Sequence, residues 1–280
     1  MRTNVCILLF YVLYLHCRTT KKEGIFVSFQ ANLDTQNVFY IYDGSFDGLL
    51  SVVYTAVYSR IIPYGILVHK GMQFSLNARY VEVPTNKNRA RRVYDAIFRK
   101  IGSFGLKRLY YVFLSDAPDK DLVIYNYMML GFKNGSVTNS ALADDTVARA
   151  FSLSENVSRE TEKFHQLTKF SVMQWGVRYA KIAPNNNILP LLTPFFVNRL
   201  KIIPFVLHDI THNVCAVYDT KEWHVSSAEG LIPPEKGNDE AEVERLWKAF
   251  FAAISIKERE HTKLQKQNMP SRYFKNVWTL

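Results

Sequence analysis

Cysteine is scarce in this chain of 280 residues, which contains only Cys6, Cys17 and Cys215. The three form no C-x-x-C pattern and no other paired spacing, so the sequence supports neither a thiol-ligated zinc site nor an iron–sulfur cluster. Few and unpaired thiols are typical of a reducing compartment. We therefore expect a cytoplasmic protein with no metal and no cofactor.

The common catalytic motifs are also missing. The chain contains no G-x-S-x-G, H-E-x-x-H or G-x-G-x-x-G sequence, no Walker loop and no Cys–His nucleophile pattern. Internal repeats and low-complexity tracts are absent as well. The motifs therefore leave open whether the chain is an enzyme.

The apolar run near the N-terminus is too short to cross a membrane. Residues 5–15 follow Arg2 as in a signal peptide, but a membrane span needs about 20 residues, and no small-x-small cleavage site follows. We expect residues 1–37 to be an extension outside the folded domain, with an export or anchor signal as the alternative. No membrane partner is expected.

Basic residues outnumber acidic ones, 35 to 25, for a formal net charge of +10 and an isoelectric point of about 9.4. The excess lies in two blocks: residues 84–133 and residues 245–280 each carry a net charge of +6. Residues 134–244 between them carry −4. An anionic partner is therefore expected, and the blocks form one positive surface if folding brings them together.

Acidic residues are missing altogether from residues 262–280, where cations are interleaved with aromatic rings and amides. Cations neutralise phosphates, rings stack on bases and amides bond to base edges, so this mixture favours a nucleic-acid contact. The alternative is an arm packed on its own domain, with rings inside and lysines outside. The residues concerned are Lys263, Lys266, Arg272, Tyr273, Phe274, Lys275 and Trp278.

A second group of cations, Arg89, Arg91 and Arg92, begins a helix predicted for residues 89–101 with Asn88 as its N-cap. Guanidinium groups bind phosphate through paired N–H donors. The three arginines are therefore candidate phosphate contacts, unless they form only the solvated start of a helix.

The hydrophobic pattern predicts an α+β fold. The elements that matter most are a strand at 38–42, a turn at 43–48, a helix at 49–58, a strand at 172–182 and an antiparallel meander at 204–225. Asp43 or Ser45 is the expected cap of the first helix. Because helices and strands are mixed without a regular βαβ order, we expect a mainly antiparallel sheet in one domain over residues 38–280.

Two aspartates, Asp43 and Asp47, lie in the turn between the predicted first strand and its helix. Ligands often bind at such a junction because helix amides attract anions, although two carboxylates repel a bare phosphate. They are candidates for a general base or for holding a divalent cation. In the alternative, one aspartate caps the helix and the other is solvated.

His208 and Asp209 form a second candidate pair for proton transfer, with Asp209 orienting the imidazole. His212 and Cys215 follow, but side chains on alternate faces of a strand do not converge on one metal ion, and zinc needs four ligands. In the alternative, His208 is a hydrogen-bonded residue of the sheet.

Seven segments of the chain form a recognisable series. They are YDGSFDGLL (42–50), RVYDAI (92–97), LYYVFLSDAPD (109–119), YMMLGFKNG (127–135), YAKIAPNNNILPLL (179–192), VLHDI (206–210) and LQKQNMPSRYFK (264–275). In this order, over residues 38–279, they resemble a bacterial and archaeal family of DNA repair or DNA metabolism proteins. The core of that family is a domain of unknown function.

The resemblance implies a role with DNA but no known reaction. The family's domain is also found fused to a uracil-DNA glycosylase-superfamily domain, and its stand-alone form is encoded beside a radical SAM protein thought to act on DNA. The turn with Asp43 and Asp47, the pair His208-Asp209 and residues 269–275 match the pattern. Glu162 and Phe195 stand where the family often has a His, so histidine chemistry is not expected there.

We therefore expect a DNA-binding accessory protein of base repair or modification, which holds DNA for a partner enzyme such as a radical SAM protein. Two alternatives stay open. One is an enzyme that processes nucleic acid with Asp43, Asp47, His208 and Asp209 in one cleft. The other is a protein-interaction subunit whose basic faces bind an acidic partner.

Overall fold

The computed structural model of this chain describes residues 37–69, 78–173 and 176–231, together with Arg245 and Tyr273. Helices and strands are mixed, which confirms the predicted α+β class. The chain divides into two compact units between Glu155 and Asn156, and each unit contains its own sheet.

The first unit is built on a three-stranded parallel sheet in the order β2–β1–β3. Strand β1 (Val38–Tyr42) lies between β2 (Gly65–Val68) and β3 (Arg79–Glu82). Its apolar, aromatic and branched side chains favour a strand that is buried on both faces. Helix α2 (Phe46–Ser59) connects β1 to β2, and such a crossover is what allows the two strands to run parallel.

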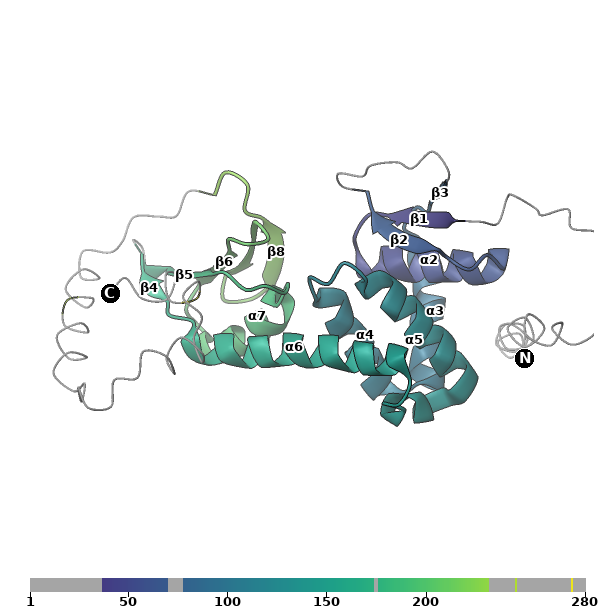
Figure 1. The fold of residues 1–280 in the computed structure, drawn as a ribbon. Helices are drawn as coiled ribbons and strands as arrows, with labels where there is room; N and C mark the ends of the chain where they lie inside the picture. Colours follow the sequence, from purple (N-terminus) through teal and green to yellow (C-terminus); the bar gives the residue numbers. More distant parts are fainter. Residues whose placement is uncertain (1–36, 70–77, 174–175, 232–244, 246–272, 274–280) are drawn as a thin grey trace, which may run out of the picture. The chain divides into compact units, whose positions relative to one another are not determined.

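Helices cover this sheet. Figure 1 shows α2 along one face of the sheet, and α2 packs on α3 (Lys87–Lys100). Helices α4 (Ser103–Leu114) and α5 (Lys120–Asn134) pack on one another and on α3, and a 3-10 turn follows at Gly135–Ser140. Their apolar faces and the sheet form one hydrophobic core.

Side chains cap the starts of α2 and α3. Ser45 accepts a hydrogen bond of 2.9 Å from the amide of Gly48, which confirms one of the two caps predicted for α2. Helix α3 begins earlier than predicted, because Asn86 has the extended backbone of an N-cap and accepts 3.0 Å from the amide of Arg89. The prediction of Asn88 as the cap was therefore wrong, since Asn88 already lies in the first turn.

The second unit contains a five-stranded sheet in the order β4–β5–β6–β7–β8. Neighbouring strands are antiparallel except β5 and β6, and the predicted meander over residues 204–225 is confirmed. The strands are β4 (Ser171–Val172), β5 (Arg178–Ile182), β6 (Phe205–Asp209), β7 (Val214–Tyr218) and β8 (Trp223–Ser227).

The strand predicted for residues 172–182 is in fact the hairpin of β4 and β5. Gly176 has a φ of 77° in the turn between them, a conformation that glycine adopts readily. Helix α6 (Asp145–Leu167) begins in the first unit and ends in the second, and α7 (Leu189–Leu200) packs on β6, β7 and β8. Within the described ranges, no helix has the length and apolar character needed to span a bilayer.

Candidate nucleic-acid interface

Two arginines and two tyrosines form a cation–aromatic cluster on α2 and α3 of the first unit. The rings of Tyr54 and Tyr58 stack with their centroids 4.2 Å apart and their planes 22° apart. The guanidinium of Arg89 lies 5.5 Å from the Tyr54 ring centre, and Arg92 reaches the Tyr54 hydroxyl at 3.5 Å. Both arginines are exposed, as is 47% of Tyr58. We call these four residues the arginine–tyrosine surface.

Helical spacing brings this surface together. Tyr54 and Tyr58 are four residues apart on α2, and Arg89 and Arg92 are three apart on α3, so each pair shares one face of its helix. No sequence motif marks the two tyrosines, although their spacing of four residues is visible in the sequence. The packing of α2 on α3 is a tertiary contact, and the sequence alone does not reveal it.

The third predicted arginine has a different neighbourhood. Arg91 forms an ion pair of 3.1 Å with Asp95, one turn later on α3, and its guanidinium lies 5.4 Å from the Tyr94 ring centre. The structure therefore divides the predicted trio: Arg89 and Arg92 face the tyrosines of α2, whereas Arg91 is paired along its own helix.

Asp43 lies in the turn between β1 and α2. Its Oδ1 accepts hydrogen bonds from the amide of Ser45 at 2.9 Å and the hydroxyl of Ser45 at 2.7 Å, and its Oδ2 accepts 2.7 Å from the Thr85 hydroxyl. Desolvation opposes the charge, but these hydrogen bonds outweigh it and lower the pKa of Asp43. Both oxygens thus brace the loop before α2, whereas the cap itself is Ser45 and not an aspartate. Asp47 is exposed in the first turn of α2, where the helix dipole favours an acid.

A buried carboxylate, Asp121, lies next to the last residue of β1. It was not among the candidates predicted from the sequence. Asp121, in the first turn of α5, accepts a hydrogen bond of 3.0 Å from the Tyr42 hydroxyl at its Oδ2, while its Oδ1 makes none. Burial raises the pKa of Asp121, and burial together with this carboxylate raises the pKa of Tyr42. The sequence did contain a signal for this residue: Asp121 is an acid in the first turn of a helix, α5, whose other residues are mostly apolar.

His208 and Asp209 are adjacent on β6, so their side chains lie on opposite faces of the sheet. The prediction that Asp209 orients His208 is therefore wrong, whereas a role of either residue in proton transfer stays a prediction. Asp209 is fully buried, and its Oδ2 lies 2.6 Å from Nδ1 of His212. Its Oδ1 accepts hydrogen bonds from the amides of Thr211 and His212 in the turn after β6. Asp209 thus orients His212 instead of His208.

His208 belongs to a polar row across the second sheet. Its Nδ1 lies 2.8 Å from the hydroxyl of Tyr179 on β5. Desolvation and the charge of Lys181 lower the pKa of His208, and burial raises that of Tyr179 to about 12. The register aligns Lys181, His208, Cys215 and Ser226 on adjacent strands, with Cys215 Sγ and Ser226 Oγ 3.5 Å apart. Strand register is a tertiary property, so the sequence analysis missed this row.

The tail residue Tyr273 is packed inside the second unit, with only 4% of its surface exposed. Its hydroxyl donates a hydrogen bond of 2.5 Å to Glu160 of α6, and its ring meets Phe164 edge to face at 4.9 Å. The Glu160 carboxylate also accepts hydrogen bonds from the amides of Asn185 and Asn186. The prediction that Tyr273 stacks on a base is therefore wrong, because a buried ring has no free face.

The other predicted tail contacts lie outside the described residues; they are Lys263, Lys266, Arg272, Phe274, Lys275 and Trp278. The four predicted catalytic residues divide between the units: Asp43 and Asp47 belong to the first, His208 and Asp209 to the second. Over the described ranges, no three His, Cys, Asp or Glu side chains gather closely enough to hold a metal ion.

Comparisons with curated proteins, solved structures and family models give one informative match. No curated protein matches the chain. A solved structure of a pGpG-specific phosphodiesterase, PggH from Vibrio cholerae, aligns with 79% of this chain and 100% of its own at 11% identity and a TM-score of 0.28, too weak a likeness for any inference. A family model for DUF4130, a domain of unknown function, matches residues 118–278. This confirms the predicted core of unknown function, and the chain belongs to the DUF4130 family.

Proposed function

We propose that this protein binds DNA through the arginine–tyrosine surface of α2 and α3. The observation that carries the proposal is that two exposed arginines meet Tyr54: the Arg89 guanidinium lies over its ring and Arg92 reaches its hydroxyl. The Tyr54 ring is itself stacked on Tyr58. Guanidinium groups neutralise phosphates, and aromatic faces stack on unpaired bases. One surface therefore offers both kinds of contact that single-stranded DNA or an extruded base needs.

The charge distribution supports the same partner. The chain has a net charge of +10, and residues 84–133, which include α3, contribute +6 of it. Such an excess attracts a polyanion and accelerates association. The resulting affinity falls steeply with salt, because cations on the protein displace the counterions condensed on DNA.

Fluorescence anisotropy with labelled single-stranded and duplex DNA, over a series of salt concentrations, tests this proposal. We expect Arg89→Gln and Arg92→Gln each to weaken binding and to reduce the slope of log K against log salt concentration by about 0.7–0.9. Arg91→Gln is the matched control, because it removes the same charge from the same helix at a residue paired with Asp95. No binding at low salt, or equal effects of all three variants, would reject the surface.

Tyr58→Leu separates stacking from charge. We expect it to weaken single-strand binding by about 1–3 kcal/mol while leaving the salt slope unchanged, because stacking releases no counterions. Equal losses on single-stranded and duplex DNA would contradict a stacking role. If DNA affinity is absent but the chain forms a nuclease-resistant complex with an acidic protein, the protein-interaction alternative is the better one.

The finer part of the proposal is an accessory role in DNA repair or DNA metabolism beside a radical SAM or glycosylase-type enzyme. It is supported by the sequence resemblance, and in such a pair the partner's cofactor carries the difficult chemistry. The test is DNA modification by the partner with and without this chain. We expect faster modification with the wild-type chain and none of this gain with the Arg89→Gln/Arg92→Gln variant. Conversion of DNA by this chain alone would favour the enzyme alternative.

A further inference from the structure

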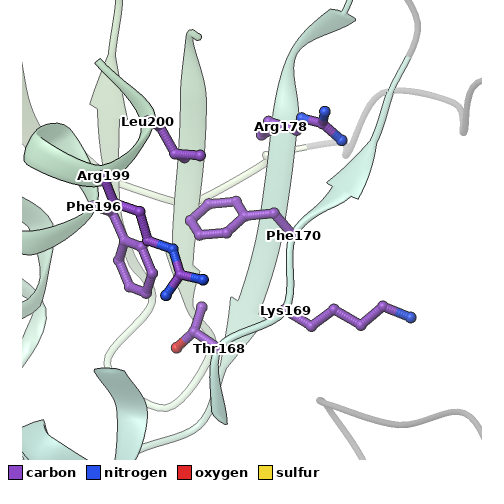
Figure 2. A pocket seen from close by; sticks show the side chains of 7 residues that line it. All are labelled: Thr168, Lys169, Phe170, Arg178, Phe196, Arg199 and Leu200. Atoms are coloured by element: carbon purple, nitrogen blue, oxygen red, sulfur yellow. The ribbon is translucent and has the colours of Figure 1, made fainter. Parts of the chain in front are cut away.

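A second basic and aromatic site lies within the second unit, in a hollow of about 300 Å³ (Figure 2). It is lined by residues that follow α6, by β5 and by the last turns of α7. Its volume is at the lower end of the range of small-molecule sites, about 300–1,000 Å³. The hollow is therefore large enough for one small ligand.

The aromatic part of the hollow is a braced ring. Phe170 is half-buried, and its ring centroid lies 5.0 Å from that of Phe196 and 5.5 Å from that of Phe205, at interplanar angles of 73° and 70°. Phe196 and Phe205 are themselves buried. This edge-to-face packing fixes Phe170 from within the unit while part of its surface stays open to the hollow. A fixed and accessible ring is what stacking on a base requires.

The polar part of the hollow is cationic. Lys169, Arg178 and Arg199 line it, and among the described residues no acidic side chain does. In the part of the chain that the structure describes, neither Arg178 nor Arg199 forms an ion pair. Figure 2 shows the Phe170 ring between the side chains of Arg199 and Arg178, with Lys169 extending away from the rings. Two guanidinium groups without carboxylate partners on either side of a ring form a local positive field that favours phosphate.

We propose that this hollow binds a single nucleotide unit, with the base against Phe170 and the phosphate groups at Arg178 and Arg199. The proposal rests on the proposed function in taking a nucleotide as the ligand, but its residues lie in the other unit from the arginine–tyrosine surface. A bare inorganic anion would leave the ring unused, and an apolar ligand would leave the guanidinium groups unused. A nucleotide, free or within a single strand, uses both.

Isothermal titration calorimetry of the full chain tests this site with three probes: inorganic phosphate, dAMP and a 5′-phosphorylated single-stranded oligonucleotide. We expect dAMP to bind more tightly than phosphate, because only dAMP stacks on Phe170. Arg178→Gln and Arg199→Gln should each weaken dAMP binding about tenfold or more, as expected for a lost hydrogen bond to a charged group. Lys221→Gln, which removes an exposed cation of the same unit outside the hollow, is the control and should change nothing.

Phe170→Leu tests the stacking half of the site. We expect it to weaken dAMP binding about tenfold while the affinity for inorganic phosphate stays the same. If Phe170→Leu unfolds at a lower temperature because its packing on Phe196 is lost, the Arg199→Gln variant tests the site instead, because Arg199 is exposed and its replacement leaves the core intact. Tighter binding of the oligonucleotide than of dAMP assigns the site to a DNA strand, and the reverse assigns it to free nucleotides.

The two proposals fail separately. If dAMP does not bind, or if the arginine variants bind it like wild type, the nucleotide site is overturned, while an effect of Arg92→Gln on DNA affinity still supports the proposed function. If dAMP binds and depends on Arg199 but Arg89→Gln and Arg92→Gln leave DNA affinity unchanged, the arginine–tyrosine surface is overturned and the nucleotide site stands.

Discussion

At the residue scale, the environment of His208 sets its protonation. Desolvation in the sheet and the charge of Lys181 on the neighbouring strand lower its pKa, and the charge of Asp209 only partly opposes them. The imidazole is therefore neutral near pH 7, and its Nδ1 lies within hydrogen-bond distance of the Tyr179 hydroxyl. A neutral imidazole in this polar row can accept a proton but does not add to the positive charge of the unit.

This environment predicts the titration of His208. By NMR, we expect an imidazole pKa below the ordinary value of about 6.5, and a rise toward that value in Lys181→Met, which removes a repelling charge. Since the pKa is lowered in the folded state, the stability linked to His208 is present above pH ~6.5 and is lost as the pH falls from there toward the folded-state pKa. Identical titration curves in wild type and Lys181→Met would contradict this account.

Tyr273 supports a prediction about stability. Tyr273→Phe keeps the ring against Phe164 but leaves Glu160 without one of its donors. We expect a loss of about 1.5–3 kcal/mol in the free energy of unfolding, measured by urea denaturation, because hydrogen bonds to charged groups are the strong ones. The control is Tyr64→Phe, at a ring that is largely exposed, and it should change stability little. Equal stability of both variants would show that the contact with Glu160 contributes nothing.

At the element scale, the start of α2 depends on a small set of local contacts. Ser45 caps the first turn, Asp43 holds Ser45 by its amide and hydroxyl, and Thr85 binds Asp43 from the chain after β3. A Cβ at Gly48 would lie 2.2 Å from the Asp43 carboxylate, so only glycine allows this approach. These contacts explain how the turn starts the helix, and a catalytic role of Asp43 and Asp47 stays a prediction.

Removing this cap should destabilise α2. For Ser45→Ala, we expect a loss of about 0.5–2 kcal/mol in the free energy of unfolding, because the amide of Gly48 loses its acceptor. Ser103→Ala is the matched control, since Ser103 is exposed at the start of α4, where no side chain caps the helix. Chemical denaturation of both variants checks this, and a loss as large for Ser103→Ala would contradict the capping role.

Element-scale predictions succeeded where the deciding interaction is local. The cap of α2 and the meander of β6, β7 and β8 follow from residues close in the sequence. The cap of α3 was predicted at Asn88 and not at Asn86, because two asparagines compete as caps within three residues. The strand predicted for residues 172–182 was wrong, because the glycine turn between β4 and β5 was taken as part of one strand. Both errors concern boundaries rather than the kind of element.

At the scale of the whole molecule, net charge matters because electrostatic attraction acts over longer distances than hydrogen bonds or packing contacts. A net charge of +10 attracts polyanions whatever their base sequence. This non-specific affinity adds to every specific contact. Arginine contacts keep their charge at any working pH, whereas lysine charges decline as the pH approaches their pKa. The contributions of arginine and lysine to polyanion binding can therefore be separated by measuring the binding at different pH values.

Heparin chromatography provides the whole-molecule prediction. We expect the salt concentration needed for elution to fall as the pH is raised from 7 toward the isoelectric point of about 9.4, because the net charge falls. Elution of the Arg89→Gln/Arg92→Gln variant should occur at lower salt than that of wild type at every pH. Elution of wild type that does not change with pH would show that a few arginines, rather than the overall charge, determine retention.

The amino-acid sequence by itself determined the α+β class, the net positive charge, the choice of Asp43 or Ser45 as the cap of α2, and the arginine cluster that begins at Arg89, because composition and short-range spacing are enough for each. Tertiary structure alone decided that Tyr54 meets Arg89 and Arg92, that Asp209 bonds to His212, and that Tyr273 is buried with its hydroxyl on Glu160. These contacts depend on which helices pack together and on which face of a strand a side chain lies. The packing of distant segments sets both, and no local pattern records it.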